Sequence, residues 1–215
     1  MPELVPIPHP GVPETYGATG NPLVVLLHDW YGRLPWLRFY AEALAHRGFR
    51  VVVPDLYDGV ATDDAGDAKT LMERLDVATA LSEIDDVVQL ARSEGSQRIG
   101  LVGFSMGGWL ALLHAQSGAA DAVAAYYATL SPEQHGVIPS PVQLHFAEFD
   151  EWDEGEDPES FIDRLKDHGT PVTQYSYPGT VHSFANATLP EKTDVNAAAL
   201  AFAHTASFLE KHLID

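Results

Sequence analysis

The segment "RIGLVGFSMGGWLALL", Arg98 to Leu113, places a serine among glycines between two apolar stretches. The first stretch (98–103) is short enough for a buried strand, and the second has the length of a buried helix. Ser105 stands at the turn between them, with Gly103 and Gly107 two residues to either side. This spacing is typical of a nucleophile elbow, because side chains at the two glycine positions would strike neighbouring backbone. The alternative hypothesis is that Ser105 only caps the helix that follows it.

Length and composition indicate one globular domain that covers residues 1–215. Hydrophobic residues make up 46% of the chain and charged residues 20%, which excludes disordered and fibrous classes. The formal net charge of −19 argues against nucleic acid or an anionic membrane as a partner. The chain has no cysteine, so disulfides, thiolate metal sites and a thiol nucleophile are excluded.

The first residues, "MPELVPIPHPGVPETYG", have neither the basic start nor the apolar centre of a signal peptide. The longest aliphatic run, Leu23–Leu27, is far shorter than the roughly 20 residues that span a bilayer. We therefore expect a cytoplasmic protein.

Short apolar segments alternate with helical periodicity along the chain. Strands are predicted at 22–28, 49–54, 98–103, 122–128, 141–147 and 172–179, and helices at 34–48, 106–116, 158–169 and 196–213. Between residues 67 and 92, apolar side chains recur every three or four positions, which predicts one long amphipathic helix or two joined helices. Strands separated by helices require crossover connections, so the pattern predicts an α/β fold with a mainly parallel sheet covered on both faces.

A serine nucleophile requires a base and an orienting acid, which follow a nucleophile elbow in the chain order acid, then histidine. His182 lies beyond the last predicted strand and is the one histidine of ten in the required place. Asp150 follows the strand predicted at 141–147 and is the preferred acid, with Glu148 as the alternative. The acidic run 150–159 lacks the ligand spacing of an EF-hand calcium loop, so we expect no metal and no other cofactor.

Six segments resemble, in the same order, the dienelactone hydrolase family of α/β-hydrolases: "HDWYG", "PDLY", "GLVGFSMGG", "AYYA", "HFAEFD" and "YPGTVHSFAN". The resemblance covers almost the whole chain and implies the compact α/β-hydrolase fold. It implies a small hydrolase with a triad at Ser105, Asp150 and His182. It further implies that the backbone N–H groups of Met106 and Trp30 form the oxyanion hole.

Three features of the sequence depart from the pattern of the family. Its best-known members have a cysteine where Ser105 stands, so this serine must lose its proton to His182 as it attacks. A glutamate is usual in the family at the position of Asp29. The shorter Asp29 carboxylate either orders the oxyanion loop or takes part in the chemistry. Members that cleave dienelactone bind the substrate carboxylate with two arginines, whereas here Asn186 stands at one position and residues 58–73 contain no arginine.

Without these arginines an anionic lactone loses charge-assisted recognition, so we expect small neutral esters or lactones as substrates. The residues expected at the substrate pocket are Asp29, Tyr31, Trp152, Phe184 and Asn186. Ordinary packing in the core is the alternative for each aromatic side chain. Two other functions stay open: a thioesterase or acyl-peptidase, and a protein of the same fold that binds a ligand without turnover.

Overall fold

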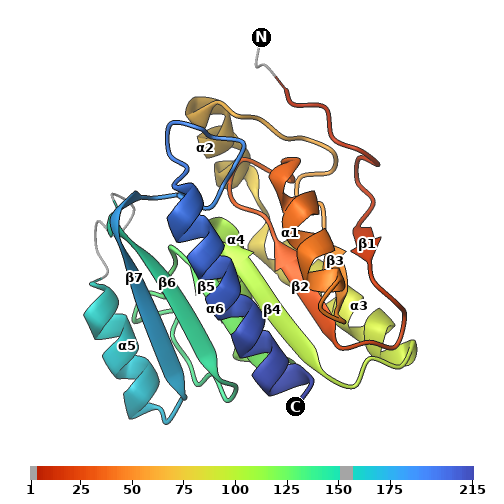
Figure 1. The fold of residues 1–215 in the computed structure, drawn as a ribbon, viewed down its shortest axis with the longest axis vertical. Helices are drawn as coiled ribbons and strands as arrows, with labels where there is room; N and C mark the ends of the chain where they lie inside the picture. The colour runs from red at the N-terminus through yellow and green to blue at the C-terminus, as the bar shows by residue number, and fades with distance from the viewer. Residues whose placement is uncertain (1–3, 151–156) are drawn as a thin grey trace.

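A computed structural model describes residues 4–150 and 157–215. Their strands form one seven-stranded sheet (Figure 1). The strand order is β1-β3-β2-β4-β5-β6-β7. All neighbouring strands are parallel except β1 and β3, which are antiparallel. The strands are β1 (Glu14–Tyr16), β2 (Leu23–Leu27), β3 (Arg50–Val53), β4 (Ile99–Phe104), β5 (Ala122–Tyr126), β6 (Val142–Phe149) and β7 (Val172–Val181).

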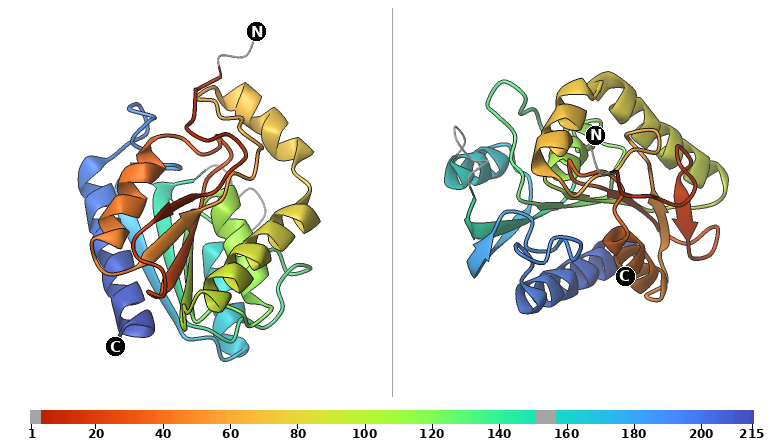
Figure 2. Two further views of the ribbon diagram at one scale, coloured as in Figure 1. Left: turned by 90° about the vertical axis from the view of Figure 1, so that its right-hand side faces the viewer. Right: turned by 90° about the horizontal axis from the view of Figure 1, so that it is seen from above.

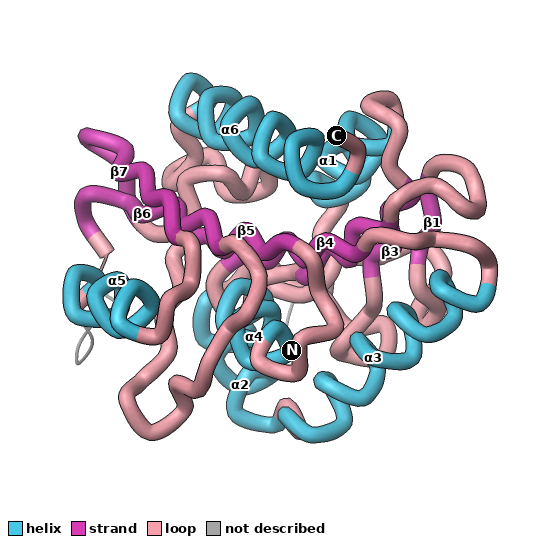
Figure 3. The backbone as a smooth tube through the Cα atoms, turned by 90° about the horizontal axis from the view of Figure 1, so that it is seen from below, coloured by secondary structure: helices cyan, strands magenta, loops and turns pink. Residues whose placement is uncertain are grey.

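Helices cover both faces of the sheet. They are α1 (Trp36–Ala45), α2 (Ala65–Arg74), α3 (Val77–Ser93), α4 (Met106–Ala115), α5 (Pro158–Asp167) and α6 (Val195–Leu213). Helices α1 and α6 lie on one face, and α2 to α5 lie on the other (Figures 2 and 3). Because both faces are covered, β2, β4 and β5 are buried along their whole length, as continuous apolar runs in a parallel sheet require.

The structure confirms the predicted α/β fold and its mainly parallel sheet. The periodic segment 67–92 forms two helices, because the Asp76 side chain accepts a hydrogen bond from the Thr79 N–H and so starts α3 as a new helix. Strand β1 is not among the strands predicted from the sequence. This strand has three residues, which is too short for an alternating apolar pattern to be recognised. Among the described strands it pairs only with β3.

Strands β6 and β7 run further than predicted and bring two distant loops together. Their pairing shifts register between Ala147 and Phe149, and Phe149 then pairs with Val181. The residues that follow these two strand ends, Asp150 and His182, therefore start from adjacent positions at one edge of the sheet.

Within residues 4–150 and 157–215, no helix combines the length and the hydropathy needed to cross a bilayer.

Candidate active site

Ser105 occupies a strained turn between β4 and α4. Its φ of 51° and ψ of −115° lie outside the regions that L-residues favour. The surrounding backbone holds this conformation, since the Ser105 N–H donates to the Tyr126 carbonyl at 2.8 Å and its own carbonyl accepts from the Trp109 N–H at 2.9 Å. The side chain makes no cap hydrogen bond with α4, so helix capping does not account for this serine.

The glycines on either side allow the turn to close. A Cβ at Gly103 would lie 2.1 Å from the Gly107 carbonyl oxygen, and a Cβ at Gly107 would lie 2.4 Å from the His28 carbonyl oxygen. Both distances are shorter than any real contact, so the packing of α4 against β2 and β4 requires glycine at these positions.

The Ser105 hydroxyl contacts the imidazole of His182. The distance from Ser105 Oγ to His182 Nε2 is 2.8 Å, and the distance from His182 Nδ1 to Asp150 Oδ1 is 2.6 Å. Because a carboxylate only accepts hydrogen bonds, Nδ1 donates to Asp150 and Nε2 keeps a lone pair for the serine proton. Ser105 is 8% exposed and His182 is 7% exposed. The pair is therefore largely shielded from bulk water, but a small molecule can still contact it.

Glu148, the alternative acid, has a different partner. Its Oε2 accepts a hydrogen bond from the Gly179 N–H at 2.6 Å, between the ends of β6 and β7. The carboxylate beside His182 is therefore that of Asp150.

Tyr127, which is not among the residues predicted from the sequence to form the site, packs against His182. Its ring centroid lies 5.1 Å from that of His182, and its hydroxyl oxygen accepts a hydrogen bond from the Ala185 N–H at 2.8 Å. Tyr127 and Ser183 both have positive φ, at 50° and 71°. Strained backbone therefore occurs at three points around the imidazole, as is common where a site fixes its side chains.

Asp29 lies buried in the loop that follows β2. Its Oδ1 accepts from the Tyr31 N–H at 3.0 Å, and its Oδ2 accepts from Asn186 Nδ2 at 2.8 Å. Burial raises the pKa of this carboxyl to about 6, although the hydrogen bonds from Asn186 and Tyr31 oppose the rise. These contacts order the loop, which favours the structural role over the chemical one.

Asn186 stands where the resemblance led us to look for an arginine. It is 1% exposed and belongs to the segment that follows His182. Its bond to Asp29 joins this segment to the loop that carries Trp30. Asn186 therefore acts in the scaffold of the site.

The two backbone donors implied by the resemblance come from different elements. Met106 is the first residue of α4 and directly follows Ser105. Trp30 follows Asp29 in the loop after β2 and is 9% exposed.

A pocket of about 280 Å³ opens at Ser105 and His182. Its other lining residues are Met72, Met106, Trp109, Tyr127, Ala128, Thr129 and Gln134. Met72 comes from α2 and Trp109 from α4, where helical spacing of apolar residues gives no signal that separates a pocket wall from the core.

The residues expected at the pocket from sequence lie deeper. Asp29, Tyr31, Phe184 and Asn186 are all buried, at 2% exposure or less, and are not among the pocket's lining residues. Trp152 falls outside the described residues.

In the part of the chain that the structure describes, no three histidine, aspartate or glutamate side chains are grouped so that they could hold a metal ion.

Comparison with known proteins identifies the family of this chain. The model of the dienelactone hydrolase family matches residues 13–213. The chain is 31% identical over 206 residues to a carboxymethylenebutenolidase of Rhodococcus opacus, covering 88% of this chain and 81% of the relative. It is 26% identical to the protein usf of Aquifex pyrophilus, covering 90% of each chain.

A solved structure shares the fold at lower identity. A dienelactone hydrolase-like promiscuous phosphotriesterase from metagenomic libraries superposes with a TM-score of 0.81 and 17% identity, over 93% of this chain and 92% of the other. The family match across nearly the whole sequence, together with this fold, shows that the chain belongs to the dienelactone hydrolase family and is a hydrolase.

Proposed function

We propose that this protein is a serine hydrolase that cleaves carboxylic esters or lactones of small neutral substrates through Ser105, His182 and Asp150. The observation that carries the proposal is the continuous contact from Ser105 Oγ to His182 Nε2 and from His182 Nδ1 to Asp150 Oδ1, at 2.8 and 2.6 Å. Such a relay has the geometry that general-base activation of a serine requires.

In the proposed reaction, His182 accepts the Ser105 proton while Oγ attacks the ester carbonyl. Asp150 holds the imidazole in the required tautomer and stabilises the imidazolium. The N–H groups of Met106 and Trp30 bind the oxyanion, and His182 then gives its proton to the leaving alcohol. Water, deprotonated by His182, cleaves the acyl-enzyme and regenerates Ser105.

The preference for neutral substrates follows from the charge around the site. Among the described residues that line the pocket there is no lysine or arginine, and Asn186 replaces one arginine of the dienelactone-cleaving pattern. The net charge of −19 also repels anions. The pocket volume of about 280 Å³ suits a short acyl group or a small lactone.

The direct test compares the wild-type protein with Ser105→Ala on p-nitrophenyl acetate and a neutral lactone. We expect Ser105→Ala to lower kcat by about 10⁴-fold or more, because the members of a triad act as a unit. Circular dichroism shows that the variant is folded. Turnover of Ser105→Ala at the wild-type rate would refute the proposal.

Thioester and amide cleavage are the nearest alternatives, because the same serine chemistry performs both. A panel of matched oxygen esters, thioesters and anilides with one acyl group separates them by kcat/KM. Binding without turnover is the remaining alternative, and a folded wild-type protein that turns over none of these substrates would support it.

A further inference from the structure

His28 is a fully buried histidine that the proposed reaction does not use. It directly follows β2, one residue before Asp29, and is 0% exposed. Its ring packs on that of Tyr57, with centroids 5.0 Å apart. Both ring nitrogens are within hydrogen-bond distance of backbone atoms. These two contacts indicate what His28 does in the site.

The two contacts fix the tautomer of this imidazole. The Leu56 N–H donates to His28 Nε2 at 3.1 Å, so Nε2 carries a lone pair and no proton. The proton is then on Nδ1, which donates to the Asp29 carbonyl oxygen at 2.7 Å. Burial lowers the pKa of His28 to about 4, so the ring is neutral at pH 7.

The Asp29 carbonyl belongs to the same peptide group as the Trp30 N–H. Because a peptide unit is planar, a donor that holds its carbonyl also sets the direction of its N–H. A hydrogen bond to the carbonyl also polarises the peptide and makes its N–H a stronger donor. We propose that His28 is a positioning residue of the oxyanion hole, which holds the Asp29–Trp30 peptide so that the Trp30 N–H meets the oxyanion. This inference rests on the proposed function.

The segment that follows β3 supports both sides of this hole. Leu56 fixes the tautomer of His28, and the Tyr57 hydroxyl donates to Met106 Sδ at 3.0 Å. This segment therefore contacts both His28, which bonds to the Asp29–Trp30 peptide, and Met106, which supplies the second oxyanion donor.

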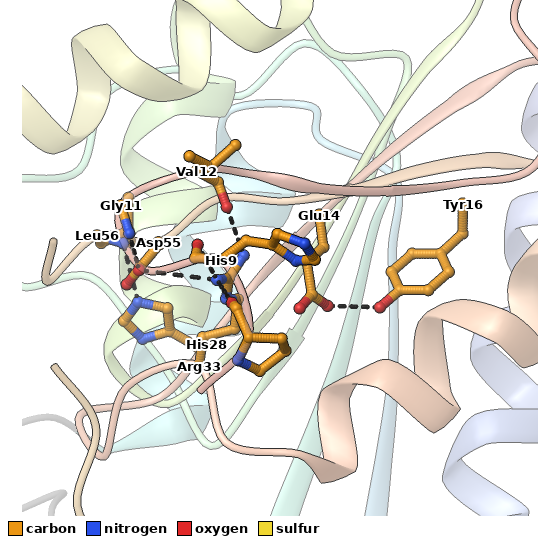
Figure 4. A network of polar contacts seen from close by, with 10 residues as sticks. His9, Gly11, Val12, Glu14, Tyr16, His28, Arg33, Asp55 and Leu56 are labelled. Carbon is orange, nitrogen blue, oxygen red and sulfur yellow. Dashed lines mark hydrogen bonds and ion pairs between the residues drawn. The ribbon is translucent and has the colours of Figure 1, made fainter. Parts of the chain in front are cut away.

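Buried charges anchor the same segment. Asp55 Oδ2 accepts from the Gly11 N–H at 2.8 Å and lies 3.8 Å from Arg33 Nη2 (Figure 4). Arg33 also donates to the Val12 carbonyl and to two further carbonyls of the N-terminal segment. These contacts join the segment that follows β3 to the N-terminal segment and hold it in place. A fixed oxyanion donor requires such a rigid support.

A purely structural role would make His28 a link between β2 and β3, with both hydrogen bonds of equal value. The positioning role gives them different value, because of the two His28 hydrogen bonds only the Nδ1 bond contacts the Asp29–Trp30 peptide, whose carbonyl also accepts the Gly32 N–H at 3.2 Å. Two substitutions separate the bonds. His28→Asn places an amide N–H near Nδ1 and loses the acceptor for Leu56, whereas His28→Gln places an acceptor near Nε2 and loses the donor to Asp29.

The experiment measures kcat and KM on p-nitrophenyl acetate for both variants, with Ser105→Ala and the exposed-site substitution His46→Gln as controls. We expect His28→Gln to lower kcat by about 10- to 100-fold, somewhat less than the loss of a whole oxyanion donor. His28→Asn should stay within about threefold of wild type, and KM should change by less than about twofold in both. Equal losses of kcat in the two folded variants would overturn the inference.

The outcomes distinguish failure of this inference from failure of the proposed function. If Ser105→Ala is inactive and the two His28 variants lose equal activity, only the positioning role fails. If Ser105→Ala keeps full turnover, the proposed function fails first.

A second measurement uses the wild-type protein and so does not depend on whether the variants fold. Nitrogen-15 NMR of the imidazoles between pH 5 and 8 should show His28 with its proton on Nδ1 and no titration. A proton on Nε2, or a titration near pH 6.5, would overturn the inference.

Discussion

The hydrogen bond between Asp29 and Asn186 joins two loops of the site that are far apart in the sequence. The two residues are 157 positions apart in the sequence and lie on the loops that follow β2 and β7. Asp29 accepts both the Asn186 amide and the Tyr31 N–H, and Asn186 Oδ1 accepts the Thr188 N–H at 3.0 Å. Every hydrogen bond of this pair has a defined direction.

That directionality permits a test by exchanging the two residues. In Asp29→Asn with Asn186→Asp, the new amide at 29 can donate to the new carboxylate at 186, while each residue keeps an oxygen for its backbone donor. We expect each single variant to lower kcat by about tenfold, because it leaves a buried polar group without a partner. The double variant should recover most of the loss. Additive losses in the double-mutant cycle would contradict the coupling.

The sequence indicated the proposed reacting groups more clearly than the side chains that support them. Glycine spacing and chain order predict Ser105, Asp150 and His182, because these patterns indicate an elbow and the ends of strands. His28 has no such signal, and Asn186 was expected at the substrate pocket and not as a hydrogen-bond partner of Asp29. Their roles depend on hydrogen bonds across the fold, which no local pattern encodes.

The walls of the pocket depend on how helices and loops meet. Trp109 on α4 donates through Nε1 to Gln134 Oε1 at 3.1 Å, and Gln116 Nε2 donates to the Gln134 carbonyl at 3.0 Å. These bonds hold the loop after β5 against α4, so the loop and the helix together form one side of the pocket.

Trp109→Ala should therefore widen the pocket and change acyl-chain preference. We expect the ratio of kcat/KM for p-nitrophenyl hexanoate over acetate to rise by about tenfold, because each methylene placed in new apolar space contributes on the order of 1 kcal/mol. Trp109→Phe keeps most of the volume and serves as the matched control. An unchanged ratio in Trp109→Ala would show that the indole does not limit the acyl site.

Periodicity explains which helices and strands could be predicted from the sequence. Buried strands and amphipathic helices have a period that can be read along the chain. The break between α2 and α3 depends on the single cap at Asp76, and β1 depends on its pairing with β3. The pocket walls, which combine α2, α4 and a loop, appear only after these elements are placed in space.

Across the whole molecule, buried histidines couple folding to pH. His145 on β6 contacts the Tyr177 hydroxyl through Nδ1 at 2.7 Å, and Gln143 Oε1 and Thr205 Oγ1 through Nε2, both at 3.0 Å. This network joins the sheet to α6. Burial lowers the pKa of His145 to about 3 and that of His28 to about 4.

Below pH 6.5 the unfolded chain binds protons on these two histidines while the folded protein does not. Their contribution to the free energy of unfolding therefore falls as the pH drops from 6.5 toward their folded pKa values. Asp29 acts in the opposite direction between pH 3.8 and about 6, because its folded pKa is raised and the folded protein binds the extra proton. The two larger histidine shifts outweigh this single carboxyl.

Urea unfolding of wild type and His145→Gln at pH 7.5 and 5.0 isolates the histidine contribution. The loss of stability between the two pH values should be smaller in His145→Gln by about 2 kcal/mol, since each pKa unit corresponds to about 1.4 kcal/mol. Equal losses in both proteins would show that His145 is not held neutral by the fold.

Covalent capture by an active-site reagent shows whether Ser105 is the nucleophile, as we propose. Wild-type protein incubated with a fluorophosphonate should gain one adduct by intact mass, and peptide mapping should locate it on Ser105. His182→Ala should react far more slowly, and Ser105→Ala should not react. An adduct on another residue, or equal labelling of folded Ser105→Ala, would show that Ser105 is not the nucleophile.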